Sequence, residues 1–128
     1  MAEPKKTILV IDDAALVRLY YRTTLEAAGF RVAEALNGLE ALEKLPGCAA
    51  DLLIVDVNMP QMDGFTFLRA LRESDPAIAG VPALVTSTEG REPDLAAARS
   101  AGANYYLVKP VDPQLLVKVA DLLCGVRR

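Results

Sequence analysis

The segment TILVIDD, residues 7–13, joins a short apolar run to two aspartates. Two further runs have the same form: LLIVD at 52–56, and YYLVK at 105–109, which ends in a lysine. Short runs rich in Val, Ile and Leu are typical of buried strands in parallel sheets, and such sheets bind ligands beyond the carboxyl ends of their strands. The charged residues that follow the runs are therefore predicted to meet at one sheet edge. They are Asp12, Asp13, Asp56 and Lys109.

The whole chain alternates between strand patterns and helix patterns. Strands are predicted at 7–11, 31–35, 52–55, 82–86 and 105–108. Helices are predicted at 14–28, at 37–45, from Phe67 through Leu71 to a point before Pro76, from Pro93 to a stop at Gly102, and at 112–126. Five alternating units of this size predict an α/β fold, a doubly wound five-stranded parallel sheet with helices on both faces.

The second predicted helix carries a signal at each end. Asn37, with Glu40 three residues later, forms a capping box, in which each side chain bonds a backbone N–H near the other residue. Pro46 and Gly47 are expected to end this helix, because proline lacks the N–H that continues the hydrogen-bond ladder.

With 128 residues, the chain has the size of one domain with a substantial core. We expect a flexible N-terminal tail at 1–6 and one domain at 7–126. The formal net charge of -3 disfavours nucleic-acid binding, and no apolar run is long enough to span a membrane. Cys48 and Cys124 lack the close spacing of zinc or redox motifs, which favours a reducing, cytoplasmic compartment. The chain contains no histidine, so histidine chemistry on this chain is excluded.

The three predicted acids at the sheet edge repel one another unless a cation or a raised pKa relieves the charge. Mg²⁺ suits this need, because it prefers oxygen ligands and commonly joins carboxylates to phosphate oxygens. Asp56 ends the most apolar strand and is predicted to be a rigidly held nucleophile toward phosphorus, which would give an aspartyl phosphate. Lys109 and the hydroxyl group of Ser87 are predicted to stabilise the phosphoryl oxygens.

Each of these residues also has an ordinary structural interpretation. Asp12 and Asp13 could cap a helix, and Asp56 could open a turn. Lys109 could be a solvated loop residue, and Ser87 could satisfy backbone groups at a strand end. Their occurrence together, each at the end of a predicted strand, favours a functional site over four separate coincidences.

Order, spacing and strand context of these residues resemble the response-regulator receiver family, most closely its single-domain, CheY-like members, over nearly the whole chain. The residues that carry the resemblance are Asp12 and Asp13, Asp56 with Asn58, Met59, Pro60, Asp63 and Gly64, then Ser87, and Lys109 with Pro110. The resemblance implies a flavodoxin-like fold with the strand order 2-1-3-4-5 that flavodoxin and CheY share. It also implies a signalling protein that catalyses its own phosphorylation and dephosphorylation, rather than an enzyme acting on other substrates.

The resemblance further implies roles for residues of the acidic edge. Asp56 is implied as the phospho-acceptor. Mg²⁺ is implied to bind directly to Asp13, Asp56 and the backbone carbonyl of Asn58, while Asp12 acts through a water molecule. A sensor histidine kinase or a phosphotransfer protein is implied as the donor of the phosphoryl group.

After transfer, Lys109 and Ser87 are implied to contact the phosphoryl group, and Asn58 and Glu89 to flank the water that hydrolyses it. Ser87 and Tyr106 are implied to switch the face formed by the helix at 93–101, the strand at 105–108 and the last helix. A downstream protein target would bind this face, as in chemotaxis-type regulators. Strand alternation predicts only that one of two neighbouring tyrosines, 105 and 106, lies inside and the other outside.

Three other functions compete with this one. A phosphorelay intermediate or phosphate-sink receiver without its own output target stays open as an alternative. A haloacid dehalogenase-type phosphatase is disfavoured, because it needs a second acid two residues after the nucleophile, where Asn58 stands. A flavodoxin-like redox protein needs a hydroxyl- and glycine-rich phosphate loop after the first strand, where Asp12 and Asp13 stand.

Overall fold

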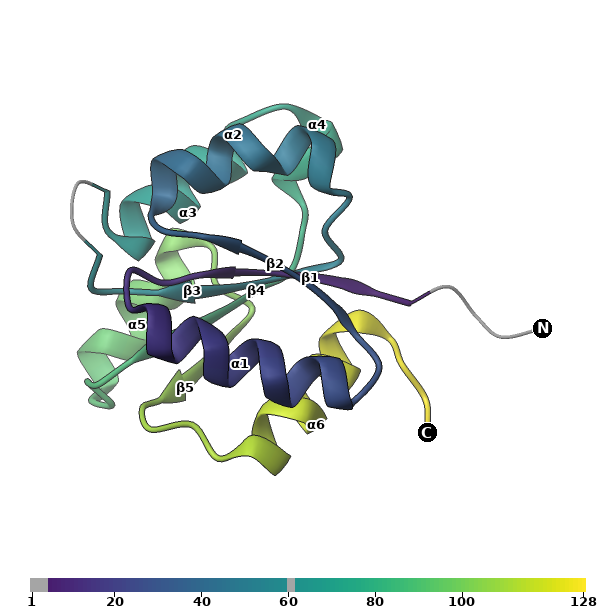
Figure 1. The fold of residues 1–128 in the computed structure, drawn as a ribbon. Coiled ribbons are helices and arrows are strands. Elements are labelled where there is room, and N and C mark those ends of the chain that lie inside the picture. Colours follow the sequence, from purple (N-terminus) through teal and green to yellow (C-terminus); the bar gives the residue numbers. More distant parts are fainter. Residues whose placement is uncertain (1–4, 60–61) are drawn as a thin grey trace.

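The computed structural model describes residues 5–59 and 62–128 (Figure 1). Five strands form one sheet, in which all neighbouring strands are parallel and follow the order β2-β1-β3-β4-β5. The strands are β1 Thr7–Ile11, β2 Arg31–Ala35, β3 Leu52–Asp56, β4 Ala83–Ser87 and β5 Tyr105–Val108. The predicted class of fold and the implied strand order are confirmed. The first four residues of the predicted tail lie outside the described residues.

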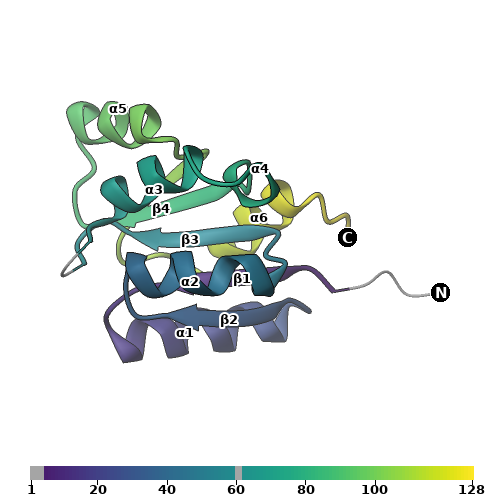
Figure 2. The same cartoon turned by 90° about the horizontal axis from the view of Figure 1, so that it is seen from above.

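Helices cover both faces of this sheet (Figure 2). They are α1 Ala15–Ala27, α2 Gly38–Cys48, α3 Gly64–Arg72, α4 Pro76–Ala79, α5 Glu92–Ala101 and α6 Pro113–Cys124. One apolar core lies between the sheet and α1 and α6, and a second lies between the sheet and α2, α3 and α5. Over the described ranges, no helix is both long and apolar enough to cross a membrane.

Two features of the helices differ from the sequence-based expectation. The expectation that Pro46 and Gly47 end α2 is wrong, because the helix continues to Cys48 and ends at Ala49, whose φ of 52° is left-handed. Proline so close to a helix end costs few backbone hydrogen bonds, which explains why the helix tolerates it. The short helix α4 was not predicted at all. Its N-cap, Asp75, accepts a hydrogen bond from a backbone N–H two residues later at 2.9 Å.

The capping residue of α2 is confirmed, with one difference in its partner. The side chain of Asn37 accepts a hydrogen bond from the backbone N–H of Glu40 at 2.9 Å. The Glu40 carboxylate, however, accepts from the N–H of Leu36 at 3.3 Å, one residue before the position that a capping box uses. The start of α2 is therefore fixed from both sides, directly after β2.

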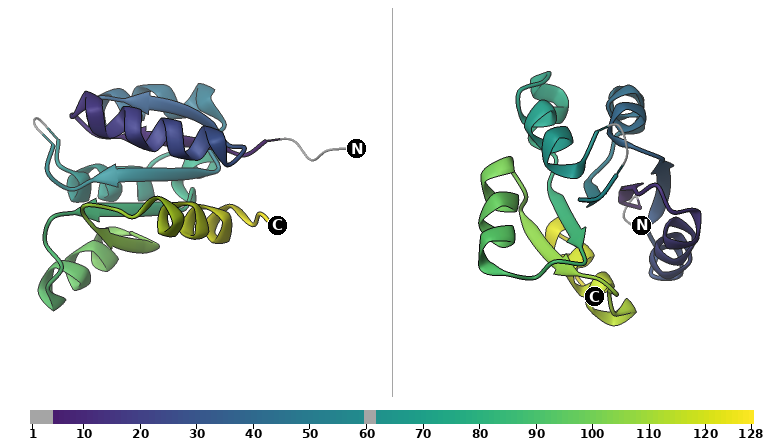
Figure 3. Two further views of the ribbon diagram at one scale, coloured as in Figure 1. Left: turned by 60° about the horizontal axis from the view of Figure 1, so that its bottom comes forward. Right: turned by 90° about the vertical axis from the view of Figure 1, so that its left-hand side faces the viewer.

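The strand register brings the carboxyl ends of the inner strands together at one end of the molecule, which the right panel of Figure 3 views. Ile11 of β1 lies beside Val55 of β3, and Asp56 of β3 lies beside Thr86 of β4. Every residue of β3 and β4 is buried. Side chains at or just after the ends of these strands therefore begin from rigid backbone.

The loop after β3 returns to the end of that strand at Gly64. The N–H of Gly64 donates to the carbonyl oxygen of Val57 at 3.0 Å. A Cβ atom at position 64 would lie only 2.5 Å from the carbonyl oxygen of Asp56. Glycine is needed here because α3 begins directly against the backbone of β3. Pro60, which contributed to the family resemblance, lies outside the described residues.

Arg72, the last residue of α3, forms hydrogen bonds with several other segments of the chain. Its guanidinium donates to the backbone carbonyls of Ala79 at 2.9 Å, of Val81 at 2.6 Å and of Gly102 at 2.7 and 3.1 Å. It also donates to the side chain of Asn104 at 3.0 Å. Burial lowers the pKa of this guanidinium. One side chain thus provides hydrogen-bond donors for backbone carbonyl groups at the end of α4, in the loop after it and at the end of α5.

We expect Arg72→Met to lower the free energy of unfolding by about 1–3 kcal/mol, because it leaves several carbonyl oxygens without their charged donor. Urea denaturation measures this change. Arg69→Met is the matched control, since Arg69 is exposed on the same helix, and it should stay within about 0.5 kcal/mol of wild type. Equal destabilisation by the two variants would contradict the role given to Arg72.

Candidate functional site

Three carboxylates gather at the carboxyl edge of the sheet. Asp12 and Asp13 follow β1, and Asp56 ends β3. One oxygen atom of each carboxylate lies within 4.8 Å of the others. Asp12 and Asp56 are buried, with 1% and 4% of their surface exposed, while Asp13 is exposed. Two buried acids this close to each other require a compensating positive charge or a raised pKa.

Lys109, directly after β5, supplies this positive charge. Its Nζ atom lies 3.1 Å from Oδ2 of Asp12 and 3.0 Å from Oδ1 of Asp56. Burial by itself lowers the pKa of Lys109, but the hydrogen bonds to the two carboxylates and their charges outweigh burial and raise it. The ammonium group therefore stays protonated between the two acids. The predicted meeting of the three acids and the lysine is confirmed as geometry.

The pKa of the Asp56 carboxyl group is shifted in the opposite sense to that of an ordinary ion-paired acid. Burial raises this pKa, and the hydrogen bond from Lys109 offsets only part of the effect, while the neighbouring charge of Asp12 adds to it. The carboxylate of Asp56 is thus incompletely compensated by the protein itself. A further positive charge at this edge would stabilise its ionised form.

Ser87 ends β4 and is buried, with 2% of its surface exposed. Its Oγ atom accepts a hydrogen bond from the backbone N–H of Glu89 at 3.1 Å. The hydroxyl proton of Ser87 remains to be donated to another acceptor. Thr86, beside Asp56 in the sheet, is fully buried, and within the described residues its hydroxyl oxygen has no hydrogen-bond partner.

The remaining predicted residues surround this edge at the surface. Asn58, two residues beyond Asp56, and Glu89 are both exposed. The Tyr106 hydroxyl donates to the backbone carbonyl of Glu89. Tyr106 is half-buried against the core between the sheet and α3, whereas Tyr105 is 41% exposed. The prediction that one of the two tyrosines faces inward is confirmed.

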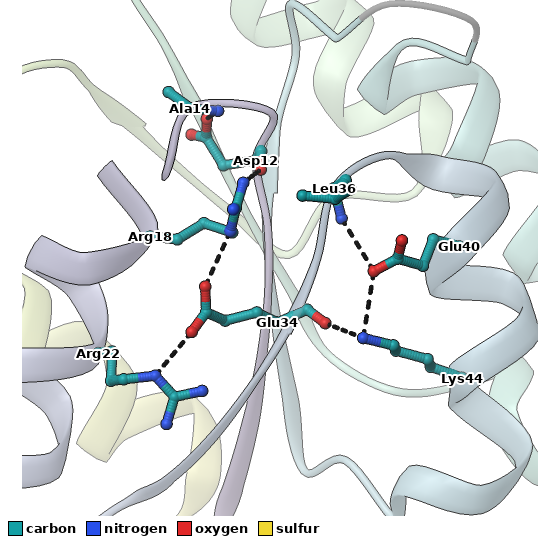
Figure 4. A network of polar contacts seen from close by, with 8 residues as sticks. All are labelled: Asp12, Ala14, Arg18, Arg22, Glu34, Leu36, Glu40 and Lys44. Carbon is teal, nitrogen blue, oxygen red and sulfur yellow. Dashed lines mark hydrogen bonds and ion pairs between the residues drawn. The ribbon is translucent and has the colours of Figure 1, made fainter. Parts of the chain in front are cut away.

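Sequence reasoning missed a contact to the backbone of the site. Arg18, in the first turn of α1, donates from Nη1 to the backbone carbonyl of Asp12 at 2.7 Å (Figure 4). It also pairs through Nε with Glu34 of β2 at 2.8 Å. The only signal in the sequence is that Arg18 and Arg22 lie four residues apart and so share one face of a helix. Nothing in that spacing shows which strand residue they contact.

Comparison with known proteins supports the fold and identifies the family. The family model described as the response regulator receiver domain matches residues 8–121. The chemotaxis protein CheY1 of Helicobacter pylori is 38% identical over 120 residues, which cover 92% of this chain and 96% of that protein. CheY of Thermotoga maritima is 34% identical over 117 residues, covering 91% and 95%.

A similar solved structure belongs to a chemotaxis protein, CheY4 of Vibrio cholerae. It superposes with a TM-score of 0.88 and 34% sequence identity, over 94% of this chain and 99% of that chain. The family model, the sequence identities and the shared fold thus agree. This chain belongs to the response regulator receiver domain family.

Proposed function

We propose that this receiver accepts a phosphoryl group on Asp56 and uses it to change its surface for a protein partner. The observation that carries the proposal is the direct contact of Lys109 with Asp56 at the buried end of β3, beside two further carboxylates, in a chain of the receiver family. Asp56 combines a fixed position with an accessible acidic neighbour, Asp13. The fixed position suits a nucleophile, and the accessible second carboxylate suits a cation bound beside it.

The residues present fit Mg²⁺, which prefers hard oxygen ligands. Asp13, Asp56 and the backbone carbonyl of Asn58 would hold the ion directly, and Asp12 would act through a water molecule. Once bound, Mg²⁺ supplies positive charge that offsets the negative charge of phosphoryl oxygens. This charge would also stabilise the negative charge of the Asp56 carboxylate, which the protein alone compensates only in part.

In the proposed transfer, a carboxylate oxygen of Asp56 attacks the phosphorus of a phosphohistidine on a sensor kinase or phosphotransfer protein. The new oxygen–phosphorus bond forms as the phosphorus–nitrogen bond breaks, and the imidazole leaves with the electron pair. Lys109 and the hydroxyl of Ser87 stabilise the phosphoryl oxygens. Because Lys109 already lies 3.0 Å from Asp56, its charge is in place before the reaction begins.

The same site would return the protein to its resting state. Asn58, two residues after Asp56, and Glu89, two residues after the end of β4, are both exposed, and we propose that they flank a water molecule that hydrolyses the aspartyl phosphate. Positioning and charge stabilisation supply most of the rate in phosphoryl transfer. The chain therefore acts as its own catalyst for both steps and as a signalling protein toward its partners.

The proposed switch passes through the backbone at position 89. The N–H of Glu89 donates to Ser87, and its carbonyl accepts from Tyr106. When the Ser87 hydroxyl turns toward a phosphoryl oxygen, its hydrogen bond with the Glu89 N–H changes geometry. The hydrogen bond between the Glu89 carbonyl and Tyr106 then changes as well. Phosphorylation then favours the active arrangement by as much as it binds that state more strongly.

The surface affected is the face formed by α5, β5 and α6. The buried residues of α5 are two alanines, Ala98 and Ala101, so this helix is held by little apolar contact and can shift at low cost. We propose a downstream protein target for this face, and a chemotaxis-type role in the cytoplasm, on the strength of the likeness to the CheY proteins.

Asp56→Asn should fold but accept no phosphoryl group, because the amide is a poor nucleophile. Intact mass after incubation with Mg²⁺ and acetyl phosphate measures the transfer, and EDTA should abolish it in wild type. Asp63→Asn is the matched control, since it makes the same chemical change at an exposed helix cap and should label normally. Labelling of the Asp56→Asn variant to the wild-type level would rule out the assignment.

Lys109→Met should lower the free energy of unfolding in EDTA by about 2 kcal/mol or more, because it leaves two buried acids unpaired. Mg²⁺ should restore more stability to this variant than it adds to wild type, since ammonium and metal ion compensate the same carboxylates and repel each other. Urea denaturation with and without Mg²⁺ tests both expectations. A smaller stabilisation of the variant than of wild type by Mg²⁺ would contradict the arrangement.

A further inference from the structure

Few hydrogen bonds hold the turn that carries Asp12 and Asp13. Within the turn, the N–H of Ala14 donates to Oδ1 of Asp12 at 2.9 Å. The N-cap of α1 is Ala14, which has no side chain able to cap the helix. The backbone N–H of Asp12 donates to the carbonyl of Ala35 in β2 at 3.2 Å. The other side of the same residue, its carbonyl oxygen, accepts from Arg18 at 2.7 Å. The backbone of Asp12 is thus fixed on one side by β2 and on the other by the side chain of Arg18 in α1.

This second contact also sets the position of Asp13. The peptide that links Asp12 and Asp13 is planar, so a fixed carbonyl direction at Asp12 fixes the direction in which the backbone enters Asp13. Asp13 is exposed, and among the described residues its carboxylate makes no hydrogen bond or ion pair. The place of this carboxylate beside the other two acids therefore depends on its backbone.

Arg18 is itself held in a defined orientation. Its side chain is only 12% exposed, and its Nε donates to Glu34 at 2.8 Å while Nη1 donates to Asp12. The guanidinium group is planar, with its donors in fixed directions, so the bond to Glu34 aims Nη1 at the Asp12 carbonyl. Figure 4 shows Arg18 lying between Glu34 and Asp12.

Glu34 in turn has contacts on both sides of β2. Arg22 binds its other carboxylate oxygen at 2.7 Å, and this hydrogen bond is the largest contribution to the lowered pKa of Glu34. Lys44 of α2 donates to the Glu34 backbone carbonyl at 2.6 Å and pairs with Glu40 at 3.1 Å. The anchor of Arg18 is therefore a strand residue fixed by two helices, as Figure 4 shows.

We propose that Arg18 is a positioning residue for the metal site: it holds the Asp12–Asp13 peptide in the orientation that lets Asp13 bind the cation. The inference rests on the proposed function, because it concerns the same Mg²⁺ ligands. According to this inference, the cationic side chain of Arg18 strengthens the binding of Mg²⁺. Charge alone would have the opposite effect, since an arginine near the site repels a metal ion.

The opposite signs allow a direct test by calorimetric titration of Mg²⁺ into the full chain at low ionic strength. Arg18→Met should weaken Mg²⁺ binding about 10-fold or more, the usual cost of losing a residue that orients a metal ligand. Arg22→Met is the matched control, because it removes the same charge from the same carboxylate without touching Asp12. It should bind Mg²⁺ as well as wild type or slightly more tightly.

Arg18→Lys adds a test at constant charge and serves also if Arg18→Met fails to fold. Lysine cannot hold Glu34 and the Asp12 carbonyl with two fixed donors, so this variant should also bind Mg²⁺ more weakly, while Arg22→Lys should not. Wild-type affinity in Arg18→Lys would overturn the positioning role and leave the metal site intact. Absence of Mg²⁺ binding by wild type would instead overturn the metal site itself, and the positioning role with it.

Discussion

The ion pairs of Lys109 with Asp12 and Asp56 are the interaction on which the rest of the site depends. Strand β4 lies between β3 and β5, so the lysine reaches across the end of a neighbouring strand to contact the acids. That strand ends in Thr86 and Ser87, which both have short side chains. Without this ammonium group, two carboxylates would be buried side by side with like charge. The strand order thus brings the ammonium group close enough to neutralise part of the charge of the buried acids.

The same arrangement leaves a defined charge imbalance. If all three acids are ionised, one ammonium group leaves two negative charges at the edge, which matches a divalent cation. Lys109 compensates only part of the charge of the buried acids, which leaves room for the proposed cation. A second lysine at this edge would complete the compensation, stabilise the apo protein and weaken the proposed cation binding.

Most of the fold followed from the sequence because buried parallel strands are short apolar runs whose ends carry the functional residues. The meeting of Asp56 with Lys109, 53 residues apart, could be predicted from this rule alone. The end of α2 could not, because a proline near a helix end costs little and local rules overstate its effect. Arg18 was also missed, because its partners lie just after β1 and within β2, and only the packing of α1 on the sheet brings them together.

Glu89 takes part in the hydrogen bonds to Ser87 and Tyr106 through its backbone only. Its side chain is exposed and is free of that task. If the Glu89 side chain acts in hydrolysis as proposed, the lifetime of the signal and its transmission are separable at this single position. Substitutions at 89 would then change how long the modified state persists, while any residue with a backbone N–H would keep the hydrogen bond to Ser87. Proline alone would break it, because it has no such donor. On this proposal, a substitution at 89 would adapt the lifetime of the signal to a different pathway and leave the face that binds the partner unchanged.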